Sequence, residues 1–369
     1  MKTSRILIVG AGISGCTLAE RYANAKNKKI LIIEKRDHIG GNCYDYDNEI
    51  GIRVNKYGPH YFRTNDDAVW EYLQQFSEWE PFEARALSVI GEKKVPIPVN
   101  IDTVNTLFDE ELETEEEMRA WLENETENIE EPKDSEESAL RRVGKRLYEL
   151  MFKNYTMKQW DKHPRELEAS VMDRIPVRHN RDDRYFTDKY QAYPKNGYTK
   201  IFDKMLSHQN IEVRLNTDWK DVEDIVHEFE KIFFTGKIDF YFNEKLGKLE
   251  YRSLRFEHEN IDKEFFQDAV QENHPHEDVP FTRIVEYKRQ TGQKNPRTTI
   301  AREFPTWDGE AYYPVPTQKN RNIYERYKQE AEKLEKEGIY FVGRLANYKY
   351  FNMDQAFKNA LDLFHRLES

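Results

Sequence analysis

Cysteine and long apolar runs are the features this chain has least of. Only Cys16 and Cys43 occur in 369 residues, and neither stands at a spacing typical of metal ligands. A disulfide scaffold is therefore excluded, and a reducing compartment, the cytoplasm, is expected. No stretch approaches the ~18 apolar residues that a spanning helix needs, and the apolar run 6–9 is too short for a secretion signal. The sequence predicts a soluble protein with no membrane span and no metal site.

Basic stripes are also missing. The net charge is −11, and residues 109–138 alone hold 15 acidic side chains against Arg119 and Lys133, so the rest of the chain is close to neutral. An acidic run of this kind is usually a solvated helix face or a loop. Without a basic stripe to neutralise phosphates, nucleic acid is not expected as a partner.

Length and aromatic content bound the remaining possibilities. A chain of 369 residues suits two or three packed units rather than one core. The 22 Tyr, 21 Phe and 6 Trp fill cores in most proteins, and in a minority they line a site that recognises sugars or bases.

The N-terminal segment predicts a βαβ unit. Residues 5–9 and 29–33 are apolar enough for buried strands, and residues 13–25 between them have helical character. A strand, a Gly-rich turn, a helix and a strand within about 30 residues indicate a parallel sheet with a right-handed crossover.

The rest of the chain predicts further strands and helices around this unit. We expect helices at 66–75, through most of 103–168, at 198–206 and at 354–367. We expect extended segments at 86–99, 184–193, 211–215, 231–235, 251–257, 282–288 and 339–342. The fold class is therefore α/β: a discontinuous Rossmann-type domain (1–80, 194–245 and 335–369), a helical insertion domain (102–168) and an antiparallel-sheet substrate domain (81–101, 169–193 and 246–334).

The strongest local motif follows the first strand. Gly10-Ala11-Gly12-Ile13-Ser14-Gly15 is a G-x-G-x-x-G turn that opens a helix, and Glu34 ends the next strand about 20 residues later. The glycines permit a tight turn and close approach of a pyrophosphate, which the helix N-terminus favours, and the carboxylate can accept from ribose hydroxyls. Together they predict dinucleotide binding, whereas the motif alone would be an ordinary Gly-rich turn.

Six further segments stand in order along the chain: Glu34 to Asn42 with its Gly40-Gly41 pair, Lys56 to Asn65 with His60, Tyr155 to Trp160 preceded by Phe152, Arg174 to Arg178 followed by Arg184-Tyr185-Phe186, Val279 to Arg283, and Glu310 to Val315 followed by Gly343 to Met353. The first of these resembles a stretch shared by flavoproteins of the amine-oxidase and mutase type, which favours FAD over NAD. All of them together resemble the UDP-galactopyranose mutases over the whole chain, and that family has a Rossmann-type FAD domain, a helical domain and an antiparallel sheet.

The resemblance implies roles for individual residues. FAD would be bound by Gly10, Gly12, Ile13, Ser14, Gly15, Glu34, Lys35, Gly41, Asn42, Gly58, His60, Arg344, Asn352 and Met353. The uridine and sugar would contact Phe152, Tyr155, Thr156, Trp160, Tyr185, Asn273 and Tyr313. The catalytic set would be Arg174, Arg283, His60 and Tyr350, with both arginines and Tyr350 on the diphosphate. Guanidinium forks suit such oxygens because they donate paired, charge-assisted hydrogen bonds.

The resemblance also implies a mechanism. Reduced FAD would attack the anomeric carbon of a UDP-sugar through N5, and the pyranose and furanose forms would interconvert without net oxidation. UDP-galactose is the default substrate, and relatives are often homodimers. Two alternatives stay open from the sequence: a flavin oxidase of the amine-oxidase group and a non-catalytic flavin-binding scaffold.

Four positions depart from the family pattern. Arg63 stands where the family usually has a second histidine, Ala84 where it has asparagine, and Asn352 where it has aspartate, and Arg85 follows Ala84. We expect these changes near the flavin and the sugar. UDP-N-acetylgalactosamine, UDP-rhamnose and dTDP-fucose therefore remain alternative substrates.

Overall fold

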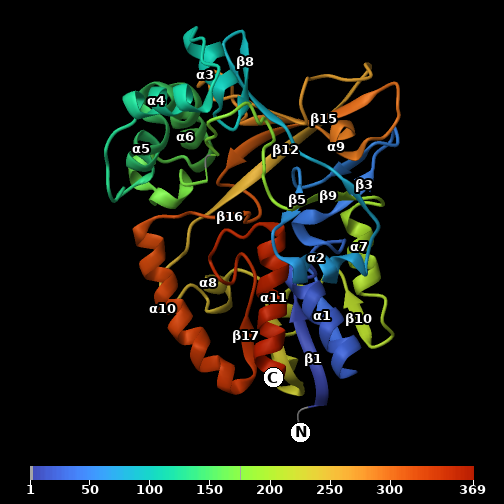
Figure 1. Cartoon of the computed structure of the whole chain (residues 1–369). Helices are drawn as coiled ribbons and strands as arrows, with labels where there is room; N and C mark the ends of the chain where they lie inside the picture. Colours follow the sequence, from blue (N-terminus) through green and yellow to red (C-terminus); the bar gives the residue numbers. More distant parts are fainter. Residues whose placement is uncertain (1–2, 175) are drawn as a thin grey trace.

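A five-stranded parallel sheet forms the lower part of the molecule in the computed structural model, which describes residues 3–174 and 176–369 (Figure 1). Ile175 of the 174–178 segment lies outside the described residues. The strand order is β10 (Ile211–Arg214), β2 (Lys29–Ile33), β1 (Thr3–Val9), β11 (Phe229–Phe234) and β17 (Ile339–Phe341), and every pair is parallel. This confirms the predicted Rossmann-type core.

The apolar runs of these strands form because both faces of the sheet are covered. Ile6 and Ile8 of β1 pack in a cluster with side chains of α1 (Ile13–Lys26), α2 (Asp67–Gln74), α7 (Tyr198–Met205) and α11 (Met353–Glu368). Leu7, between them, points to the opposite cluster around Trp219 and Phe229. Since successive residues of a strand alternate faces, a continuous apolar strand is what a sheet buried on both sides requires.

A seven-stranded sheet lies above the parallel one (Figure 1). Its order is β16 (Tyr313–Pro314), β12 (Tyr251–Ile261), β15 (Thr298–Thr306), β14 (Arg283–Glu286), β13 (Gln271–Asn273), β7 (Ala86–Ile90) and β8 (Lys93–Ile97). All neighbours are antiparallel except β13 and β7, which run parallel. The predicted antiparallel sheet is therefore present with one parallel pair inside it.

Helices fill the segment between β8 and β9, as predicted. They are α3 (Ile101–Phe108), α4 (Glu115–Glu125), α5 (Ser135–Leu147) and α6 (Asn154–Trp160), with a π-helical segment, Tyr148–Lys153, between the last two. Met118, Trp121, Val143 and Leu147 form their common core. The acidic residues of α4 lie on its outer face, where a capping box joins Thr114 and Glu117. Two small sheets complete the fold, β3 (Asp45–Asp47) with β4 (Arg53–Asn55), and β9 (Tyr190–Pro194) between β5 (Phe62–Thr64) and β6 (Trp79–Pro81).

Three sequence expectations were wrong or incomplete. The extended segment 86–99 is a hairpin, β7 and β8, that turns at Gly91 with a φ of +60°. The strand expected over 184–193 begins only at Tyr190, because Arg184 instead closes a local turn in which its N–H donates to Asp182. Strand β15 and the helices α8 (Ile238–Tyr241), α9 (Tyr287–Thr291) and α10 (Gln318–Leu334) were not predicted.

Candidate active site

The Gly-rich turn joins β1 to α1 at the carboxyl edge of the parallel sheet. Gly10 has a φ of +102°, and a Cβ there would lie 2.1 Å from Thr235 Oγ1. Gly41 has a φ of +56°, and a Cβ on it would lie 2.9 Å from the Cα of Gly12. The two backbone segments therefore meet with no room for side chains, and this bare backbone cradle fits a dinucleotide cofactor that approaches main-chain N–H groups.

Glu34 is built into the same cradle. It is 7% exposed, and its two carboxylate oxygens accept hydrogen bonds from the N–H groups of Ala11 (2.9 Å) and Arg36 (3.0 Å). Lys35 instead points to the surface, with Nζ 3.3 Å from Glu310. Its neighbour Arg36 lies deeper: it donates to Asn42 Oδ1 at 2.9 Å and stacks 4.2 Å from the Tyr57 ring. Lys35 and Arg36 both pair with Glu310, and Arg36 lies nearer to Asn42, another residue expected at the cofactor.

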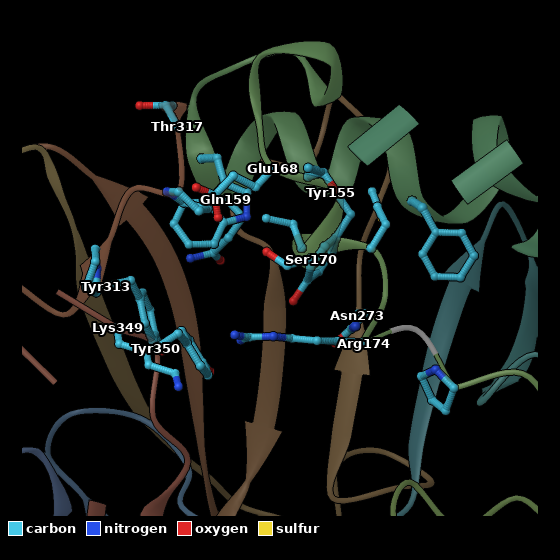
Figure 2. A pocket seen from close by; sticks show the side chains of 18 of the residues that line it. Tyr155, Gln159, Glu168, Ser170, Arg174, Asn273, Tyr313, Thr317, Lys349 and Tyr350 are labelled. Carbon is cyan, nitrogen blue, oxygen red and sulfur yellow. The ribbon is translucent and has the colours of Figure 1, made fainter. Parts of the chain in front are cut away.

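A first cavity of about 620 Å³ opens beneath helix α6 (Figure 2). All seven residues expected at the uridine and sugar line it, as do both diphosphate arginines and Tyr350: Phe152, Tyr155, Thr156, Trp160, Arg174, Tyr185, Asn273, Arg283, Tyr313 and Tyr350. These residues come from segments up to 198 positions apart, from Phe152 to Tyr350, so the fold brings together what the motifs only suggested.

A second cavity of about 970 Å³ contains the expected flavin-side residues of the later motifs. His60, Gly58, Asn42, Arg344, Asn352 and Met353 line it. Seven residues line both cavities, which therefore adjoin: Arg174, Pro176, Tyr185, Arg283, Tyr313, Lys349 and Tyr350. The remaining predicted cofactor residues, Gly10, Gly12, Ile13, Ser14, Gly15, Glu34, Lys35 and Gly41, line neither cavity and lie around the Gly-rich turn.

The two arginines at this junction differ in their partners. Arg283 Nε and Nη2 both lie 2.8 Å from Oε2 of Glu303, whose side chain is 2% exposed, and Nη1 donates to Gln271 at 3.3 Å. Desolvation opposes the charge of Arg283, but the carboxylate of Glu303 outweighs it and raises the arginine's pKa. Arg283 is therefore a cation held in one orientation by a buried anion.

Arg174 has no such counter-ion. Among the described residues no carboxylate pairs with it, and its guanidinium lies 3.9 Å from the ring of Tyr350, towards which it points across the cavity (Figure 2). The Arg174 side chain faces the open cavity. Desolvation by the surrounding protein lowers its pKa, but an arginine stays protonated at neutral pH. Tyr350 in turn stacks on Tyr313, with ring centroids 5.3 Å apart. The guanidinium of Arg344 lies 5.1 Å from the centroid of the Tyr350 ring. The junction thus presents unneutralised positive charge.

The aromatic hydroxyls around the junction are hydrogen-bond donors. Burial raises the pKa of Tyr155, Tyr185 and Tyr313, so these phenols keep their protons at neutral pH. Trp160 is 8% exposed and lies edge-on to Tyr313 with centroids 6.4 Å apart. Flat faces and polar tips of this kind suit a base and a ribose.

His60 is held in one tautomer. Its Nδ1 lies 2.9 Å from the carbonyl oxygen of Gly58, so Nδ1 donates and Nε2 carries no proton. Desolvation, followed by the charges of Arg344 and Arg283, lowers the pKa of His60 to about 4. The imidazole is therefore neutral at physiological pH.

The positions that depart from the family pattern fall into two groups. Arg63 and Asn352 line the second cavity; Arg63 Nη1 lies 2.8 Å from Asp188, and the guanidinium stacks 4.1 Å from the Phe186 ring. Ala84 and Arg85 line neither cavity. Ala84 is 2% exposed behind Tyr185, and Arg85 pairs with Asp183 on the surface. Of the four positions expected near the flavin and sugar, Arg63 and Asn352 line the second cavity, Ala84 lies directly behind the cavity residue Tyr185, and Arg85 lies on the surface.

Sequence reasoning missed several residues of the site. Glu303 lies in strand β15, where it is buried although Arg302 beside it is only partly so, and the sequence alone carries little signal for it. Gln159 and Lys349 line the cavities and stand between motif positions that were named. Within the described ranges, no helix is long and apolar enough to cross a membrane, and no three His, Cys, Asp or Glu side chains converge as a metal site would need.

Comparisons with known proteins agree with this architecture. Residues 8–76 match the family described as an NAD(P)-binding Rossmann-like domain, and residues 150–350, more than half of the chain, match the family described as UDP-galactopyranose mutase. A protein named dTDP-fucopyranose mutase from Escherichia coli is 37% identical over 97% of this chain and 97% of its own length. A probable UDP-galactopyranose mutase from Klebsiella pneumoniae is 37% identical over 98% of this chain and 94% of its own.

Solved structures show the same fold. A crystal structure of reduced UDP-galactopyranose mutase superposes with a TM-score of 0.77 at 16% identity, covering 100% of this chain and 94% of that one. The fold and the two cavities define an enzyme built on a flavin-type nucleotide-binding domain. The chain belongs to the UDP-galactopyranose mutase family, and the mutases of this family are isomerases.

Proposed function

We propose that the chain is an FAD-dependent UDP-sugar mutase that interconverts pyranose and furanose forms. The observation that carries this proposal is the junction of the two cavities, where Arg174, Arg283 and Tyr350 line both. A UDP-sugar with its diphosphate at this junction would extend its uridine beneath α6 and its sugar towards His60. The family assignment favours a mutase over the amine-oxidase alternative.

The proposed cofactor fits the residues present. The cradle of Gly10, Gly12 and Gly41, with Glu34 beside it, would hold the adenosine diphosphate portion of FAD, and His60, Arg344, Asn352 and Met353 would border its ring. When bound and reduced, FAD supplies a nucleophile at N5. The N-terminus of the 16-residue helix α11 opens on the second cavity, and the positive end of its dipole favours an electron-rich ring there.

The chain's own residues would bind and orient the substrate. Arg283, fixed by Glu303, and Arg174, which has no carboxylate partner among the described residues, would bind the diphosphate and stabilise the negative charge that it gains as the bond to the anomeric carbon breaks. Tyr350 would donate to the same group. Neutral His60 would stay next to the sugar without adding charge.

The identity of the sugar is a finer proposal. Arg63 and Asn352, which depart from the family pattern, line the second cavity. The residues of the first cavity that match the family pattern include Tyr155, Trp160, Arg174 and Arg283. Changes at the sugar end with a retained nucleotide end support a UDP-hexose other than galactose. The similar protein from Escherichia coli, named for dTDP-fucopyranose, indicates that sugars vary among relatives.

The experiment is product analysis with dithionite-reduced enzyme. UDP-galactose, UDP-N-acetylgalactosamine, UDP-rhamnose and dTDP-fucose, each in its pyranose or furanose form, are incubated with enzyme, and the ring forms are separated by chromatography. Conversion of at least one UDP-sugar supports the proposal. If none is converted by flavin-loaded, reduced enzyme, the proposal is overturned in favour of the non-catalytic scaffold.

A further inference from the structure

Helix α6 carries four residues of the first cavity and is the last part of a longer helical segment. Its seven residues, Asn154–Trp160, continue from the π-helical Tyr148–Lys153 without a break; only Thr156 and Trp160 among them are buried, and Met157 on the outer side is 38% exposed. A helical end that buries so few side chains depends on the tertiary contacts that it does make. The position of Tyr155, Thr156, Gln159 and Trp160 against the diphosphate arginines therefore depends on contacts of this helix with neighbouring segments.

One such contact is a lysine held in a ring of carbonyl oxygens. The ammonium group of Lys158 donates to the main-chain oxygens of His274, His276 (3.0 Å), Val279 (2.9 Å) and Phe281 (2.9 Å). All four belong to the connection between β13, which ends at Asn273, and β14, which begins at Arg283. Both of these flanking residues line the first cavity, so Lys158 joins α6 to the segment that carries the opposite wall.

A second cation binds the same C-terminal turn of the helix from another side. Arg252, which is 3% exposed, donates to the carbonyl oxygens of Gln159 (2.9 Å) and Lys158 (3.2 Å) and stacks 4.5 Å from the ring of Trp307. Carbonyls of the last helical turn lack partners within the helix and attract cations. Arg252 stands opposite Tyr313 in the pairing of β12 with β16, so this contact fixes α6 relative to a third wall of the cavity.

We propose that Lys158 and Arg252 are positioning residues that set the width of the nucleotide-binding cavity. Neither side chain lines either of the two cavities described above, and among the described residues neither has a carboxylate partner. Each is committed to main-chain oxygens of the segments that it joins. Without these contacts α6 would shift relative to Arg283, Asn273 and Tyr313 on the other walls of the cavity. This inference rests on the proposed function, because it assumes that the cavity binds the nucleotide.

The test measures UDP binding to flavin-loaded enzyme by calorimetry and, independently, through the intrinsic tryptophan fluorescence, to which Trp160 in the cavity contributes. Lys158→Met and Arg252→Met should each raise the Kd for UDP about tenfold or more, since small misplacements of binding groups are costly. KM for the UDP-sugar should rise more than kcat falls. FAD content should not change, because the Gly-rich turn lies on the other sheet. Lys145→Met, an exposed lysine on α5, is the matched control and should behave as wild type.

Three results separate the possibilities. A Kd for UDP equal to wild type in both folded, flavin-loaded variants overturns the inference, and so does a loss of UDP binding only in parallel with FAD and thermal stability. If Lys158→Met does not fold, Lys158→Gln, which keeps two donors for the carbonyl ring, replaces it under the same criteria. Failure of the wild-type enzyme to bind UDP would instead contradict the proposed function itself.

Discussion

Arg174 and Arg283 should fail in different ways when they are removed, although both are proposed to bind the diphosphate. Each substitution by alanine removes a charge-assisted anchor, which is worth about 2–4 kcal/mol in the transition state and lowers kcat/KM about 30- to 900-fold. Only Arg283, however, neutralises a buried anion: Glu303 is 1% exposed and would lose its counter-ion. Breaking such a pair from one side costs about 3 kcal/mol of folding stability.

The assay combines steady-state kinetics, flavin absorbance and thermal unfolding. Arg174→Ala should lose activity at wild-type stability, because among the described residues that arginine has no carboxylate partner. Arg283→Ala should lose both activity and folding stability. Adding Glu303→Gln, which removes the unpaired buried charge, should restore part of the stability but none of the activity. Arg302, next to Glu303 on β15, forms a surface pair with Glu259 of the neighbouring strand β12. Arg302→Ala is therefore the matched control and should change stability by less than about 1 kcal/mol.

Equal stability of Arg174→Ala and Arg283→Ala would refute the reasoning about Glu303. Loss of bound flavin together with activity in both variants would show that these arginines are structural.

Three further predictions follow from the cofactor cradle, the second cavity and the neutral histidine. Purified protein should be yellow with about one flavin per chain, and a colourless protein that takes up no FAD would contradict this. Gly41→Ala should weaken FAD binding by more than about tenfold, whereas Gly51→Ala, also at a positive φ (+77°) but with nothing within 4 Å, should not. UDP-galactofuranose should have a lower kcat/KM than the furanose form of another UDP-hexose, and a galactose value at or above every competitor would end that idea while leaving the family assignment intact. Because burial lowers the pKa of His60 to about 4, the imidazole of the unfolded chain takes up its proton at a higher pH than that of the folded chain. The stability of the fold should therefore drop as pH falls from about 6.5 to 4, and drop less in His60→Gln. The value of kcat/KM should show no titration of His60 above about pH 5, and an essential group with a pKa near 6.5 that disappears in His60→Gln would refute this.

The parallel core of the fold was predictable because its signals are local in the sequence. The run of residues 29–33 and the Gly-rich turn before it specify a buried strand and a phosphate-binding turn within about 30 residues, so the parallel core was predictable. Strand β15 was missed because Arg302 and Glu303 interrupt its apolar pattern, and α10 because few of its residues are apolar, although the buried ones recur at helical spacing. Both are stabilised by long-range packing, which a single sequence does not display.

The same limit applies to the site. Motifs identified many of the residues that line the two cavities, because each motif is local. The pairing of Arg283 with Glu303 spans two strands and became visible only in the folded chain. Arg85 shows the opposite error, since a position named for its neighbours in sequence lies on the surface against Asp183. Lys158 lies within the motif Tyr155 to Trp160, but its hydrogen-bond acceptors belong to a loop more than 115 residues away in the sequence, so the motif did not indicate them.

The most direct test of the central claim compares oxidised and dithionite-reduced enzyme on the same UDP-sugar, with ring forms separated by chromatography. We predict that reduced enzyme interconverts the furanose and pyranose forms over many turnovers without consuming reductant, and that oxidised enzyme is inactive. Equal activity in both redox states, or consumption of one equivalent of reductant per turnover, would contradict a mutase that uses flavin as a nucleophile.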